Sequence, residues 1–162
     1  MTRRLLSPVL NTRIIRGARS GVVGAAAATG ALLAFGLRQG MPARPFNAVA
    51  ALLLGNGARS VWGFDLRVSS TGVFLLLAGC VIASLILSLA VDAITARSAR
   101  PRVGITMFGF ALLVGLIGVA LVARHAPDFV GPQPVGAMTI SQAIVVTVLI
   151  SAGFASGMRL AR

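Results

Sequence analysis

The sequence contains no lysine, glutamate or tyrosine, and it has only one cysteine, one histidine and three aspartates. A single cysteine excludes a disulfide framework and a cysteine-rich metal site. Three widely separated aspartates provide none of the paired carboxylates that two-acid hydrolysis and di-metal sites require. The chain also lacks a phosphate-binding loop and a glycine-rich dinucleotide fingerprint. We therefore expect a protein that is not an enzyme and that holds no metal or cofactor.

The positions of the single histidine and cysteine limit the chemistry further. His125 lies just beyond an apolar stretch and not within it, so haem or pigment ligation inside a membrane is not expected. Cys80 lies inside an apolar stretch that contains no histidine, which leaves nucleophilic acyl transfer without an obvious base.

Long parts of the chain contain no charged residue, and 57% of all its residues are hydrophobic. A helix needs about 20 apolar residues to cross a hydrocarbon core about 30 Å thick. The sequence therefore predicts an all-α membrane protein with four transmembrane helices, forming a single domain over residues 1–162. The predicted spans are residues 20–37, 69–92, 103–123 and 137–158. The first is weakly hydrophobic and resembles a secretory signal, but its polar lead-in is long, so we expect a retained helix.

All 15 basic residues are arginines, and they give the chain a net charge of +12. Such a charge suggests nucleic acid for a soluble protein, but here the arginines flank apolar spans, where the expected partners are anionic lipid head groups. Ten arginines fall on the side of both termini and five on the other, which predicts cytoplasmic termini. The expected contacts with lipid or a partner are Arg13, Arg16, Arg19, Arg97, Arg100, Arg102 and Trp62.

The connection after the first span contains a short apolar segment, residues 46–54, between paired prolines and a Gly-Asn-Gly turn. Nine helical residues rise only about 14 Å, which is too short to cross a bilayer. One interpretation is an interfacial helix that lies flat on the membrane. The other is a re-entrant half-helix, with Arg44 at its start favouring an anion.

The segment from Arg44 to Arg59 resembles a loop of small uncharacterised bacterial inner-membrane proteins. In that group a Phe-Asn-Ala motif precedes a hydrophobic turn and a Gly-acidic pair, whereas Asn56 occupies the acidic position here. The resemblance covers about a tenth of the chain. It implies a bacterial inner membrane and no particular activity.

Small residues recur at helical spacing along the predicted spans, and such residues allow close contact between membrane helices. We expect these contacts at Gly24, Ala28, Gly115, Thr147, Ser151, Gly153 and Gly157. They indicate a tight bundle, with surface left over for another subunit.

One polar stripe follows the second span, where Cys80, Ser84, Ser88 and Asp92 recur every four residues. Hydroxyls that end at a carboxylate can pass a proton or bind a cation. Alternatively, the hydroxyls bond to neighbouring backbone and Asp92 pairs with Arg97 or Arg100 at the cytoplasmic boundary.

These observations favour a non-catalytic accessory or scaffold subunit that packs against a larger membrane complex, with an energy-transducing complex as one candidate. The alternative is a small transporter or channel that uses the short helix 46–54 as a gate and the polar stripe as its path.

Overall fold

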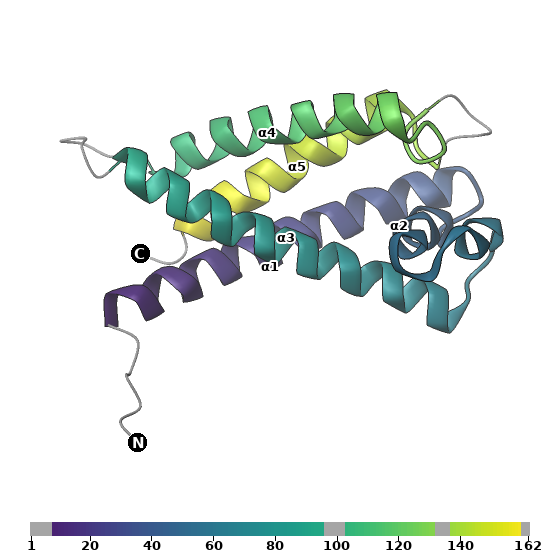
Figure 1. Cartoon of the computed structure of the whole chain (residues 1–162), viewed down its shortest axis with the longest axis horizontal. Coiled ribbons are helices and arrows are strands. Elements are labelled where there is room, and N and C mark those ends of the chain that lie inside the picture. Colours follow the sequence, from purple (N-terminus) through teal and green to yellow (C-terminus); the bar gives the residue numbers. More distant parts are fainter. Residues whose placement is uncertain (1–7, 96–102, 132–136, 160–162) are drawn as a thin grey trace, which may run out of the picture.

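The computed structural model describes residues 8–95, 103–131 and 137–159, and this part of the chain is almost entirely helical (Figure 1). Its elements are α1 (Pro8–Arg38), α2 (Arg44–Leu54), the 3₁₀ helix η1 (Asn56–Ser60), α3 (Leu66–Thr95), α4 (Val103–His125) and α5 (Ile140–Arg159). Four of them, α1, α3, α4 and α5, are long and apolar enough to span a membrane. The chain is a multi-pass membrane protein, and the predicted fold class of four spans plus one short helix is confirmed.

The four long helices form a bundle with two distinct ends (Figure 1). At the α2 end, α1 and α4 finish, α3 and α5 begin, and α2 fills the space between them. At the termini end, α1 begins and α5 finishes, so Pro8 and Arg159 lie on the same side of the bundle. Helices α3 and α4 approach each other at the termini end and separate toward the α2 end.

Helix α1 begins twelve residues before the predicted first span. Pro8 to Arg38 form one continuous helix of 31 residues, so the polar lead-in to the predicted span is helical from Pro8 onward. Its length is about 46 Å at 1.5 Å per residue, well beyond the hydrocarbon core of about 30 Å. The additional turns carry Arg13 and Arg16, and they are held against α3 at Gly17, where a Cβ would lie 2.8 Å from the Leu85 side chain.

The helix boundaries follow local capping chemistry. Gly40 and Gly55, with φ of +70° and +79°, follow the ends of α1 and α2. Helix α5 begins at Ile140 and not at the predicted residue 137, because Ala137 and Met138 donate backbone hydrogen bonds to Asp128 and Phe129. Its first turn carries a capping box, in which the Gln142 N–H donates to Thr139 Oγ1 and the Thr139 N–H to Gln142 Oε1.

The centre of the bundle is a crossing of α1 and α5 in which backbone meets backbone. A Cβ on Gly157 would lie 2.5 Å from Ser20 Cα, and one on Gly153 would lie 2.7 Å from Gly24 Cα. The fully buried Ser20 hydroxyl also donates to the Phe154 carbonyl across the crossing, at 2.6 Å. Close backbone approach and interhelical hydrogen bonding are the interactions that join helices in lipid.

Replacing Gly157 with leucine should separate α1 from α5, because the backbone of Ser20 occupies the volume of the new side chain. We expect Gly157→Leu to destabilise the fold by at least ~2 kcal/mol, at the upper range for overpacking. Gly30→Leu is the matched control, since a Cβ there meets no atom within 4 Å. Thermal unfolding in detergent measures both, and equal melting temperatures for the two variants would contradict this packing.

Candidate functional site

A groove lies between α3 and α4, and its floor is α5. It consists of two adjoining cavities of about 350 and 240 Å³, which share Val49, Leu76 and Thr147 in their walls. Apolar side chains supply most of the lining. We call this feature the α3–α4 groove.

Glycines open both walls of the groove. A Cβ on Gly79 of α3 or on Gly118 of α4 would meet no atom within 4 Å. Gly115 differs from them, because it receives the methyl group of Thr147 and so lets α4 pack on α5. Gly79 and Gly118 therefore leave space that no other part of the described chain fills.

The polar groups on the groove floor are already hydrogen-bonded. Thr147 Oγ1 donates to the Ala143 carbonyl at 2.9 Å, and Ser151 Oγ donates to the Thr147 carbonyl at 2.8 Å. Both bonds stay within α5, so the floor presents mainly methyl and methylene groups. The groove is suited to an apolar occupant and offers little to a polar solute.

Helix α2 closes the groove at one end, and a buried asparagine holds this helix in place. Asn47 Nδ2 donates to the carbonyls of Val61 and Gly63, at 2.8 and 3.0 Å. Its Oδ1 accepts a hydrogen bond of 2.8 Å from the Ser69 hydroxyl of α3. The absence of a side chain at Gly72 lets the Phe46 backbone contact α3 directly. Seven of the eleven α2 residues are buried, so α2 packs into the end of the bundle.

The start of α2 does not present the free cation that an anion site needs. The Arg44 guanidinium stacks on the Trp62 ring, 4.7 Å from its centroid. Trp62 itself is 54% exposed at the α2 end, the kind of position that tryptophan occupies at a membrane–water boundary. Nearby, Arg59 pairs with Asp128 at 3.1 Å and so connects η1 to the segment after α4.

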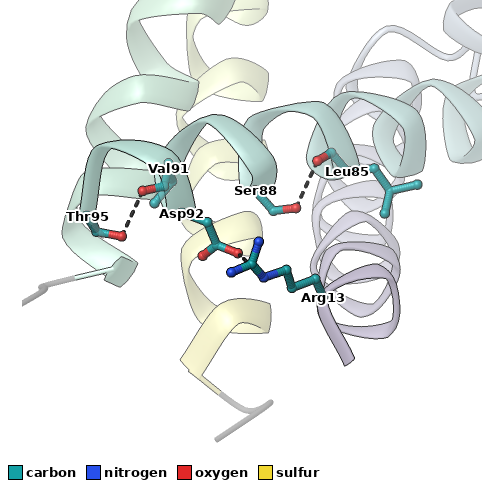
Figure 2. A network of polar contacts seen from close by, with 6 residues as sticks. All are labelled: Arg13, Leu85, Ser88, Val91, Asp92 and Thr95. Atoms are coloured by element: carbon teal, nitrogen blue, oxygen red, sulfur yellow. Dashed lines mark hydrogen bonds and ion pairs between the residues drawn. The ribbon is translucent and has the colours of Figure 1, made fainter. Parts of the chain in front are cut away.

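Two members of the polar stripe of α3, Ser88 and Asp92, are drawn in Figure 2. Ser84 Oγ donates to the Gly17 carbonyl of α1 at 2.9 Å, and Ser88 Oγ donates to the Leu85 carbonyl of its own helix at 2.8 Å. Cys80 is buried in the wall of the α3–α4 groove. The hydroxyls therefore bond to backbone, as in the second of the two interpretations.

Asp92 pairs with an arginine of another helix, which the sequence analysis had not named as its partner. Its Oδ2 lies 3.5 Å from Nε of Arg13 on α1 (Figure 2). The predicted partners Arg97 and Arg100, like Arg102, lie outside the described residues. Arg13 reaches Asp92 because α1 extends beyond the predicted span and runs beside the last turns of α3. The spacing of residues along α3 could not predict this contact, because Arg13 lies on another helix.

The residues predicted for helix contact lie within the bundle. Gly24, Gly153 and Gly157 form the crossing of α1 and α5, and Ala28 is fully buried in the same helix pair. Gly115 and Thr147 join α4 to α5, and Ser151 is buried beneath the groove. These contacts are made inside one chain, so they do not mark a surface for another subunit.

Two polar residues with a clear structural role were missed by the sequence analysis. Asn47 is the only amide inside the apolar segment 46–54, and Ser20 lies at the polar edge of the first span. The signal was present for Asn47, because a buried amide in an apolar helix needs several partners. The partner of Ser20 could not be inferred, since it lies 134 residues away in sequence.

Comparison of the chain with models of protein families, with curated proteins and with solved structures finds no match.

Removing the Asn47 amide should loosen α2. We expect Asn47→Ala to cost about 1–3 kcal/mol, because the Ser69 hydroxyl and two backbone carbonyls lose their partner. Asn56→Ala, at an exposed position two residues after α2, is the control. Hydrogen exchange of the α2 amides in detergent tests this, and unchanged protection in Asn47→Ala would show that the amide does not hold the helix.

Proposed function

We propose that this protein is a non-catalytic accessory subunit, which packs against a larger membrane complex through the α3–α4 groove. The observation that carries the proposal is a pair of glycines in the groove walls, Gly79 and Gly118. A Cβ on either would meet no atom of the described residues within 4 Å.

Helices α3 and α4 bury the smallest shares of their apolar segments. In the most apolar segments of α1 and α5, 44% and 39% of the residues are buried, against 22% for α3 and 11% for α4. Lipid covers an apolar helix face as well as protein does, so exposure alone does not indicate a partner. Glycine in a helix is different, because it costs about 1 kcal/mol relative to alanine and is useful where another backbone approaches.

The dimensions of the groove fit side chains of a neighbouring helix. A whole helix about 10 Å across does not fit in cavities of about 350 and 240 Å³. Ridges of side chains from a helix that lies along α3 and α4 would enter them, which is how packed helices interlock. The proposed partner is thus a transmembrane helix of another protein.

The orientation in the membrane is part of the proposal. The excess of arginines on the side of the termini supports cytoplasmic termini. The Ala-, Gly- and Arg-rich composition and the resemblance of the segment 44–59 favour a bacterial inner membrane. The transporter alternative receives less support, because Ser84 and Ser88 bond to backbone and Asp92 pairs with Arg13.

Filling the groove should release the partner and leave the bundle intact. We expect Gly79→Leu and Gly118→Leu to fold, since neither new side chain starts from a clash, but to lose the protein that co-purifies with the parent chain. Gly109→Leu places the same substitution on exposed α4 surface, where a Cβ also meets no atom within 4 Å, and should retain the partner.

Extraction from the native membrane in mild detergent, followed by native mass spectrometry, measures the complex. A stoichiometric larger assembly in the parent chain and in Gly109→Leu, absent in the two groove variants, is the expected result. A parent chain that is extracted alone, or groove variants that keep the assembly, would contradict the proposal.

A further inference from the structure

A separate cavity, outside the α3–α4 groove, combines apolar walls with one cation. It has a volume of about 390 Å³ and lies between α1 and α5 near the termini end, lined by Ile15, Ala18, Arg19, Val22, Val23 and Gly157. We propose that this cavity, the Arg19 cleft, binds one anionic phospholipid, with its phosphate on Arg19 and an acyl chain along Val22 and Val23. This inference does not depend on the proposed partner complex.

Arg19 lies at the level of lipid head groups. It is 19 residues from Arg38, the last residue of α1, so the two are about 28 Å apart along the helix. That separation matches the thickness of the hydrocarbon core, about 30 Å. The stretch between them, from residue 20 to residue 37, contains no charged residue. Arg19 and Arg38 therefore mark the two boundaries of the membrane on this helix.

The charge of Arg19 is not neutralised within the described chain. Its side chain is exposed, and it makes no ion pair with any of the three aspartates. Asp92, at the same end of the bundle, pairs with Arg13, while Asp65 and Asp128 lie at the α2 end. Arg19 is thus available for an anion, and a guanidinium suits a phosphate because it can donate two hydrogen bonds at once.

The walls select a lipid over a soluble anion. Val22 and Val23 lie about one helical turn from Arg19 on the membrane side, and Gly157 on α5 contributes no side chain to the opposite wall. Below the phosphate, the cleft therefore presents aliphatic surface to an acyl chain. A soluble phosphate ion has no apolar part to place against these groups, whereas a phospholipid brings an acyl chain attached to the phosphate that Arg19 would hold.

The test is lipid retention by the purified full-length chain, with Arg38→Gln as the matched control for Arg19→Gln. Both variants remove one exposed arginine from α1, at opposite membrane boundaries. After delipidation in detergent, the protein is titrated with phosphatidylglycerol or with zwitterionic phosphatidylcholine, and bound lipid is counted by native mass spectrometry.

We expect one phosphatidylglycerol per parent chain, about five-fold weaker binding in Arg19→Gln, and parental binding in Arg38→Gln. Val22→Asn should also weaken the binding of phosphatidylglycerol, because it puts an amide against the acyl chain. It leaves the Arg19 charge in place. Equal losses in the two arginine variants, or equal retention of phosphatidylcholine, would overturn the site. Because purified protein and added lipid are used, the result is independent of any partner protein.

Discussion

The close approach of α1 and α5 is the contact on which the other helices depend. At this crossing the backbones of Ser20 and Gly24 occupy the space where side chains on Gly157 and Gly153 would otherwise lie. The buried hydrogen bond from the Ser20 hydroxyl to the Phe154 carbonyl fixes the position of α1 along α5. In a membrane, where burial of apolar surface does not by itself drive helices together, such close packing has to supply the association.

Helices α3 and α4 pack on different members of this central pair, and the α3–α4 groove results from that arrangement. Helix α3 packs on α1 at Gly17 and Gly21, and α4 packs on α5 where Gly115 receives Thr147. Since α3 and α4 are attached to different central helices, they separate toward the α2 end (Figure 1). Helix α2 fills only that end, and the middle of the space remains as the α3–α4 groove. The proposed accessory role and the proposed lipid site thus use separate cavities of the bundle.

The sequence was sufficient for the number and approximate position of the spans, because charge-free stretches of this length are rare outside membrane helices. The spacing of small residues indicated which helix faces make close contacts, but not the neighbour that each face meets. Gly153 and Gly157 were expected to make helix contacts, but the sequence did not indicate that α1 is the helix they meet. The same limit applies to Asp92, whose partner Arg13 lies 79 residues earlier in the sequence. Only the folded structure shows beside which glycines another helix of the same chain packs, and beside which, such as Gly79, no described residue does.

The most direct test of this account is whether the crossing forms within one chain or between two. Residues on the crossing itself cannot carry a probe, because a Cβ at residue 157 would lie 2.5 Å from Ser20 Cα. Val22 on α1 and Ser156 on α5 are both exposed, so in a Cys80→Ala background Val22→Cys and Ser156→Cys can carry spin labels whose separation is measured in native membranes. One short distance that persists when labelled chains are diluted with unlabelled chains is the predicted result. A distance that disappears on dilution, or no short distance at all, would show that the central contact is not the one described here.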